Sequence, residues 1–148
     1  MKRFLSIIIL IEFFISATAQ LKSPESFLGY KIGEHFTPHA QLVNYFRHAA
    51  EAAPEMMSIT DYGKTNEGRP LLLAYISTAE NIRNLENIRK NNLRLTNMAL
   101  DRMAPVLETP VIVWLSYNVH GNEPSSSEAS MLTLYSLHDA SNTNAKAW

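Results

Sequence analysis

The sequence of 148 residues contains no cysteine, no Lys/Arg-rich run and almost no net charge. Without cysteine, the chain cannot form disulfide scaffolds, thiolate zinc sites, iron–sulfur clusters or a thiol nucleophile. The 13 basic and 14 acidic residues give a net charge of -1, which provides no long-range attraction to nucleic acid or to an anionic membrane. A hydrophobic share of 46% with 18% charged residues is typical of a globular protein and argues against wholesale disorder.

The sequence also lacks an apolar run long enough to span a membrane, and its longest one lies near the N-terminus. Residues 4–11 are uncharged and apolar, and they follow the basic pair Lys2 and Arg3; a small-residue pattern, Ala-Thr-Ala, ends at Ala19. A spanning helix needs about 18 or more apolar residues. Residues 1–19 are therefore predicted to be a secretory signal peptide. We expect an exported protein, periplasmic or secreted, with no membrane attachment after cleavage.

Helical and strand periods divide the chain after this leader. Residues 20–36 show little period and are predicted to be an irregular lead-in. Apolar residues recur at helical spacing over residues 38–53, which predicts an amphipathic helix with Thr37 as its N-cap. Two apolar runs, residues 57–62 and 70–77, flank a turn with glycine at both ends and predict a β-hairpin.

The second half of the chain predicts two more helices and a buried strand. Residues 80–100 are charged and rich in asparagine, which favours an exposed surface helix. Residues 111–117 (VIVWLSY) are typical of a strand buried on both faces, as in a parallel sheet. A helix is expected over residues 125–137, with apolar side chains on one side at Ala129, Leu132 and Tyr135. Together these elements predict an α/β fold, a three-layer α/β/α sandwich with a mixed sheet, which is incomplete in this chain.

Residues with metal-binding chemistry follow the predicted buried strand directly. In open α/β sheets, sites form where the chain leaves the carboxyl end of a strand. His120 and Glu123 offer a nitrogen and an oxygen ligand suited to zinc. Gly121 lets the backbone bend sharply, and Pro124 starts the next helix. The alternative is an ordinary loop with a surface histidine and a glutamate favoured by the helix dipole, and it stays open here.

The spacing of the two candidate ligands is weak evidence, because a second His-x-x-Glu pair occurs at His48 and Glu51. That pair lies inside the helix predicted over residues 38–53, and we interpret it as a solvated helix face. The remaining candidates are interpreted as structural. They are the surface histidines His35 and His39, the helix-capping His138, and Ser125, Ser126 and Ser127, which lack a glycine elbow and an obvious base.

Two motifs give the chain a resemblance to a known family. Residues 111–128, an apolar strand, His-Gly-Asn-Glu-Pro and a helix, resemble the zinc-ligand segment of M14 metallocarboxypeptidases. The form His-Gly-Asn-Glu is similar to that of the regulatory carboxypeptidase branch. Residues 62–71 resemble the Gly-x-(Ser/Thr)-x-Glu-Gly-Arg-Pro-Leu hairpin upstream of that segment. The resemblance covers about residues 27–140, and the leader is similar to that of large exported bacterial members.

This resemblance implies that His120 and Glu123 are the first two ligands of a Zn²⁺ ion completed by a histidine and a water. The implied activity is hydrolysis of peptide bonds in a peptide or protein substrate by the zinc-bound water. The family's third ligand, its general base and its carboxylate-binding residues come from later segments, whereas 25 residues follow Glu123 here. No catalytic residue is therefore identified.

The resemblance further implies that residues 37–148 are the N-terminal part of an M14-like peptidase domain. The chain is accordingly expected to be a fragment or a truncated gene product, inactive in isolation. Two alternatives remain: a zinc amidohydrolase of the deacylase type, and a non-catalytic exported domain with the same fold.

Overall fold

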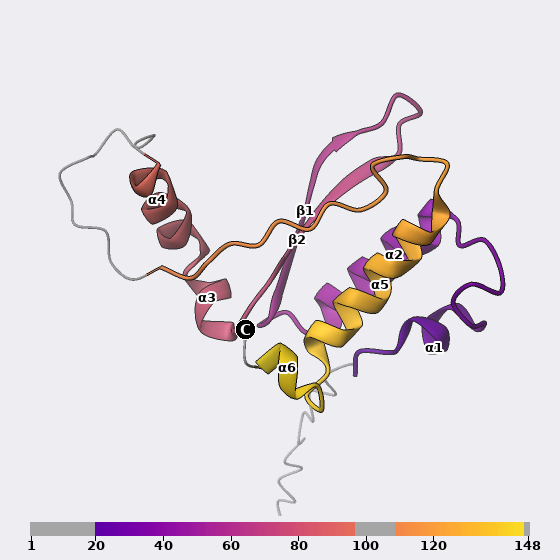
Figure 1. The fold of residues 1–148 in the computed structure, drawn as a ribbon, viewed down its shortest axis with the longest axis horizontal. Helices are drawn as coiled ribbons and strands as arrows, with labels where there is room; N and C mark the ends of the chain where they lie inside the picture. The colour runs from indigo at the N-terminus through magenta and orange to yellow at the C-terminus, as the bar shows by residue number, and fades with distance from the viewer. Residues whose placement is uncertain (1–19, 97–108, 147–148) are drawn as a thin grey trace, which may run out of the picture.

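The computed structural model describes residues 20–96 and 109–146, so the predicted signal peptide lies outside the described residues. The fold is mixed α/β (Figure 1). Among the described residues, no helix has the length and apolar character needed to cross a membrane. The elements, in chain order, are α1 (Pro24–Leu28), α2 (His39–Ala52), β1 (Met57–Lys64), β2 (Pro70–Ile76), α3 (Ala79–Arg83), α4 (Leu85–Leu95), α5 (Pro124–His138) and α6 (Thr143–Lys146).

The predicted hairpin is confirmed: β1 and β2 pair antiparallel, from Met57 opposite Ile76 to Lys64 opposite Pro70. The register shifts between Asp61 and Gly63, which leaves Tyr62 as the extra residue of a β-bulge. The turn between the strands closes through a hydrogen bond from the Gly68 amide to the Thr65 carbonyl, 2.9 Å. Gly68 has a φ of 77°, a left-handed conformation that glycine adopts without steric cost.

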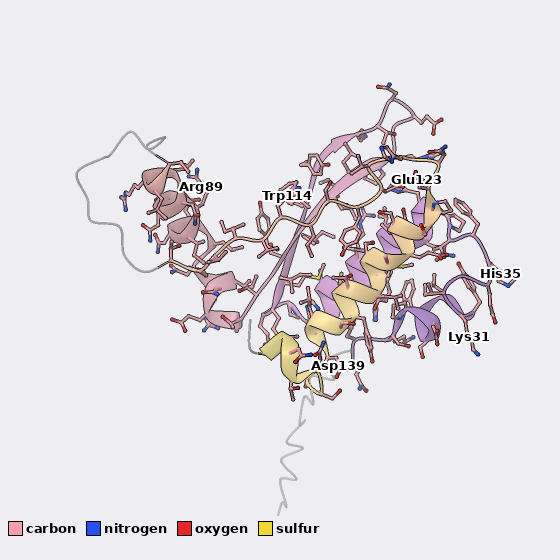
Figure 2. All side chains as sticks on the ribbon, viewed as in Figure 1. Lys31, His35, Arg89, Trp114, Glu123 and Asp139 are labelled. Atoms are coloured by element: carbon pink, nitrogen blue, oxygen red, sulfur yellow. The ribbon has the colours of Figure 1, made fainter. Side chains whose placement is uncertain are left out.

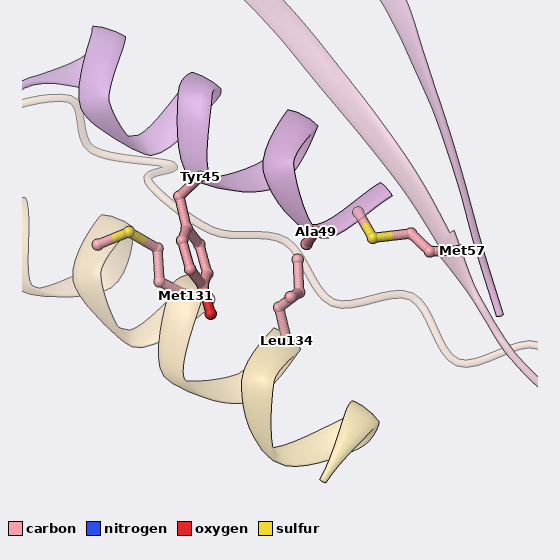
Figure 3. Close-up of a cluster of buried hydrophobic side chains, with 5 residues drawn as sticks. All are labelled: Tyr45, Ala49, Met57, Met131 and Leu134. Carbon is pink, nitrogen blue, oxygen red and sulfur yellow. The ribbon is translucent and has the colours of Figure 1, made fainter. Parts of the chain in front are cut away.

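The core forms where α2 packs against the hairpin and α5 packs beside α2. Its fully buried side chains come from all three elements: Tyr45, Ala49, Met57, Met131 and Leu134 (Figure 3). Each large apolar side chain buried in this way stabilises the fold by about 1.5–3 kcal/mol. The Tyr45 hydroxyl donates a hydrogen bond to the Lys22 carbonyl at 3.0 Å. Burial raises the pKa of Tyr45, and Tyr135 adds to the effect, so this hydroxyl stays a neutral donor.

Helix α2 confirms the predicted amphipathic helix but begins one residue later, at His39, with Pro38 as the N-cap. Thr37, the predicted N-cap, serves a different purpose. Its hydroxyl donates to the carboxylate of Glu128 on α5 at 2.7 Å, and both residues are buried. The threonine therefore joins the start of α2 to α5 instead of capping its own helix.

The lead-in over residues 20–36 is not irregular throughout, because it contains α1. The Ser23 hydroxyl accepts a hydrogen bond from the Ser26 amide, Pro24 occupies the first helical turn, and Gly29 ends the helix with a φ of 81°. These are the usual start and stop signals of a helix, compressed into five residues. The helix is too short for an apolar period to reveal it.

The single surface helix predicted over residues 80–100 is wrong in its extent, because the structure has two helices there. Asn84, at φ -110° and ψ 14°, is the C-cap of α3 and the N-cap of α4. Within α4, Glu86 pairs with Lys90, four residues on, at 3.7 Å and with Arg89 at 2.7 Å. The part of the prediction from residue 97 onward lies outside the described residues.

Residues 111–117, hereafter the apolar segment, are the main correction to the predicted fold. They form no strand, and every one of them is exposed, with Val111 at 88% and Trp114 at 70%. Figure 2 shows Trp114 standing out from the chain where it crosses from α4 toward α5. A strand buried on both faces needs hydrogen-bonded neighbours, and the described residues supply none for this segment. Residues of the segment and of β2 line two hollows of about 250 and 690 Å³, and residues of α4 also line the larger one.

The face of α5 that enters the core also differs from the prediction. The buried residues are Glu128, Ser130, Met131 and Leu134, whereas Leu132 is 43% exposed. Within the described residues the sheet has the two antiparallel strands alone, with α2 against it and α5 beside α2. The mixed α/β character is confirmed, and the three-layer sandwich with a mixed sheet is not.

Candidate metal centre

Two hydrogen bonds to α5 hold the chain as it leaves the apolar segment. The Tyr117 hydroxyl donates to the Thr133 hydroxyl at 2.9 Å. The backbone amide of Asn118 donates to the Ser126 hydroxyl at 2.7 Å. Asn118 has a φ of 56° and is the only non-glycine residue with positive φ in the described part of the chain. The backbone therefore turns sharply at Asn118, immediately before the candidate ligands.

The turn that follows brings His120 and Glu123 together. The amide of Glu123 donates to the carbonyl of His120 at 2.9 Å, which closes the turn. Nδ1 of His120 lies 2.9 Å from Oε2 of Glu123, and both side chains are exposed, at 70% and 61%. An ionised carboxylate can only accept, so the ring nitrogen donates in this contact. Glu123 lies at the N-terminal end of α5 (Figure 2).

Glu123 is the N-cap residue of α5, yet its side chain makes no capping hydrogen bond. Its carboxylate bonds to the histidine instead. The helix dipole favours a carboxylate at this position without a capping hydrogen bond, so the contact with His120 is compatible with both interpretations of Glu123.

The donor set fits part of a zinc site. Two ligands at the usual Zn–N and Zn–O distances are about 3.3 Å apart in tetrahedral geometry, and the observed 2.9 Å is close to that separation. Both donors are accessible from solvent. Across residues 20–96 and 109–146, however, no group of three or more His, Cys, Asp or Glu side chains is arranged to hold a metal ion. The two candidate ligands are one fewer than the three protein ligands that a catalytic zinc normally has.

The other histidines have structural roles. His48 accepts a hydrogen bond from the Lys22 amide at 3.2 Å and stacks on Phe27, so it fixes the lead-in on α2. Its partner in the second His-x-x-Glu pair, Glu51, is exposed. His138 bonds through Nδ1 to the Leu134 carbonyl at 2.8 Å, which confirms its place at the helix end.

The prediction of two surface histidines near the start of α2 holds for one of them. His35 is exposed and touches Tyr30 edge-on. His39 is half-buried, and its Nε2 lies 3.1 Å from the Pro70 carbonyl at the start of β2. The ring therefore links α2 to the hairpin.

Two polar contacts that end on α5 have no counterpart in the sequence interpretation. The Ser126 hydroxyl accepts from the Asn118 amide beside the candidate ligands. Glu128, farther along the helix, is 8% exposed and accepts from the Thr37 hydroxyl, whose oxygen lies 3.0 Å from the Tyr30 hydroxyl. One signal was available for Asn118, because asparagine is among the residues that tolerate left-handed backbone. Contacts across 91 residues of sequence, as between Thr37 and Glu128, leave no local pattern.

Comparison with known protein families places these residues in context. The zinc carboxypeptidase (peptidase M14) family model matches residues 42–147, which include the hairpin, the turn with His120 and Glu123, and α5. No curated protein and no solved structure matches the chain. The family match extends over well over half of the sequence and agrees with the resemblance carried by the two motifs. The chain therefore belongs to the zinc carboxypeptidase family.

Proposed function

We propose that the chain contributes His120 and Glu123 as two Zn²⁺ ligands to a carboxypeptidase-type site that hydrolyses peptide bonds. The observation that carries the proposal is the 2.9 Å contact between Nδ1 of His120 and Oε2 of Glu123. It lies within the segment that the zinc carboxypeptidase family model matches. A nitrogen and an oxygen donor brought together on one short turn are the chemistry that such an ion requires.

The bound ion would activate a water molecule and polarise the scissile carbonyl. In this proposal, His120 and Glu123 occupy two coordination positions of the ion, and the turn that carries them sets their orientation. Nδ1 of His120 faces Glu123, so for both side chains to bind one ion the ring proton must lie on Nε2 instead of Nδ1.

We further propose that the 148-residue chain by itself binds zinc weakly and does not hydrolyse peptides. Two protein ligands leave the remaining positions to water, which lowers both the affinity and the definition of the geometry. The general base that the family uses is not identified among the described residues. Proton transfer by such a base typically contributes about 10²–10⁴-fold to the rate.

The test is a zinc titration of the full chain followed by NMR of the histidine rings. Zn²⁺ should shift the signals of His120 and leave those of His48 unchanged. His120→Ala should remove the binding, whereas His48→Ala should retain it because His48 serves α1 and α2. His48 is a matched control, since it has a glutamate at the same spacing. Zinc binding that survives His120→Ala would show the metal assignment to be wrong.

We also propose that residues 1–19 direct export and are removed. The basic start, the apolar run and the small residues that end at Ala19 support this. Mass spectrometry of the protein recovered outside the cytoplasm should give a chain that begins at Gln20. A full-length product retained in the cytoplasm would contradict it.

A further inference from the structure

The two hydrogen bonds that tie the end of the apolar segment to α5 hold different parts of the chain. Their acceptors, Ser126 and Thr133, are seven residues apart, so they lie on one face of the helix about two turns from each other. The bond to Thr133 holds the end of the apolar segment through the side chain of Tyr117. The bond to Ser126 holds the backbone itself and closes a nine-residue loop that contains both candidate ligands.

The backbone held by Ser126 is in a conformation that needs support. Asn118 has a φ of 56°, which L-residues rarely adopt because Cβ approaches the neighbouring carbonyl. Asparagine tolerates this region better than most residues, but the conformation still competes with extended backbone. A hydrogen bond of 2.7 Å from the Asn118 amide to a side chain on a rigid helix favours the left-handed state.

From Asn118 the chain reaches His120 in two residues, so the direction of the backbone at Asn118 sets where the imidazole lies. The other end of the turn is fixed as well, because Pro124 begins α5 and Glu123 precedes it directly. The helix thus holds one ligand by covalent continuity. The bond between Asn118 and Ser126 is the contact with the helix that holds the backbone on the His120 side of the turn.

We propose that Ser126 is a positioning residue for the two candidate zinc ligands, His120 and Glu123. Through the Asn118 amide, its hydroxyl holds the turn in the form in which His120 faces Glu123. The role in metal binding rests on the proposed function, whereas the role in holding the turn rests on the observed hydrogen bond. Side chains that orient ligands without touching the metal commonly change metal affinity by about 10–100-fold.

The decisive measurement is amide hydrogen exchange in the full chain, compared between Ser126→Ala and Thr133→Val. Ser126→Ala should speed exchange about fivefold or more at Asn118 and at Glu123, the factor that one ordinary hydrogen bond gives. Glu123 donates to His120 and does not touch Ser126, so its exchange reports the turn rather than the lost contact. Amides inside α5, such as those of Met131 and Leu134, should keep their rates. Ser126→Thr retains the hydroxyl and should restore the wild-type pattern.

Thr133→Val is the matched control, because it removes the other hydrogen bond to α5 without opening the loop. It should leave the exchange of Glu123 unchanged. The proposal is overturned if Ser126→Ala leaves the Glu123 rate unchanged, or if it speeds exchange along the whole of α5.

Zn²⁺ titration separates this inference from the proposed function. Ser126→Ala should weaken binding of Zn²⁺ about tenfold or more, and Ser126→Thr should not. If His120→Ala leaves zinc binding intact, the assignment of His120 and Glu123 as zinc ligands is wrong, while the exchange result for Ser126 stands. If His120→Ala abolishes binding but Ser126→Ala leaves the affinity unchanged, Ser126 does not position the ligands and the inference fails.

Discussion

Apolar side chains occur both in the core between α2 and α5 and in the apolar segment over residues 111–117, yet the core side chains are buried and those of the segment are exposed. Tyr45, Met131 and Leu134 are at most 1% exposed. In the apolar segment, the exposed fraction of the hydrophobic residues ranges from 36% at Tyr117 to 88% at Val111. Apolar character alone therefore does not decide burial in this chain.

The difference lies in where each region finds its hydrogen-bond partners. A helix pairs its backbone groups internally, so α2 and α5 need only one apolar face each to pack together. A strand pairs its backbone with neighbouring strands, and a strand that is buried on both faces also needs a packed layer on each side. The described residues provide those neighbours for β1 and β2 but not for the apolar segment. Burial of a strand is thus a collective property that a single segment cannot produce.

The largest expected effect comes from the buried side of this comparison. Leu134→Ala should lower the free energy of unfolding by about 2–5 kcal/mol, because it removes core contacts and leaves a cavity. Leu132→Ala, two residues earlier on the same helix and 43% exposed, should cost much less. Urea denaturation of the two variants measures both values. Equal losses would mean that α5 presents a different face to the core.

The next effect concerns the polar contact at the edge of the core. Thr37→Val should cost about 1–3 kcal/mol, because it leaves the buried Glu128 carboxylate without the hydroxyl that donates to it. Thr37→Ser keeps the donor and should retain most of the stability. Thermal unfolding of the pair distinguishes loss of the hydrogen bond from loss of the methyl group. If the serine variant is as unstable as the valine variant, packing rather than the hydrogen bond explains the role of Thr37.

On the exposed side, Trp114→Ala should change the free energy of unfolding by less than about 0.5 kcal/mol, as expected for a surface substitution. The same change should reduce concentration-dependent association, since contiguous exposed apolar side chains promote it. Sedimentation velocity over a range of protein concentrations tests the second effect. In a Trp148→Phe background, the fluorescence of Trp114 should resemble that of tryptophan in water. A loss of stability comparable to that of Leu134→Ala would place Trp114 in a core.

Local signals in the sequence predict the α2 helix, the hairpin and α5 well. Apolar period, proline and glycine mark these elements, and their bounds in the structure differ by one or two residues. The signals fail where the outcome depends on distant partners. The sequence could show that residues 111–117 are apolar, but not that no described strand pairs with them. Likewise, the local sequence pattern does not predict that one helix ends and the next begins at Asn84.

The candidate site shows the same division. His120 and Glu123 could be chosen because they follow an apolar run, flank a glycine and precede a helix-starting proline. The structure brings them to 2.9 Å and shows that His48, at the same spacing, is committed to packing. The supporting residues were not predictable. The bond between Asn118 and Ser126 depends on the angle at which the chain enters α5, which no spacing rule states.

The smallest expected effect on stability comes from the exposed ion pair between Glu86 and Arg89 on α4. The hydrogen bond with Arg89 is the main cause that lowers the pKa of Glu86 from 4.5 to about 2, and the charges of Arg89 and Lys90 add to it. Because the carboxylate pKa is lowered in the folded state, its stabilisation is present above about pH 4.5 and is lost as the pH falls toward 2. The three side chains are exposed, so solvent and salt screen the interaction and its effect on stability is small. An NMR titration of the Glu86 carboxyl should give a midpoint well below 4.5, and Arg89→Gln should move the midpoint upward. A wild-type midpoint near 4.5 would show that this pair does not persist in solution, and that α4 relies on Ile88 and its own backbone instead.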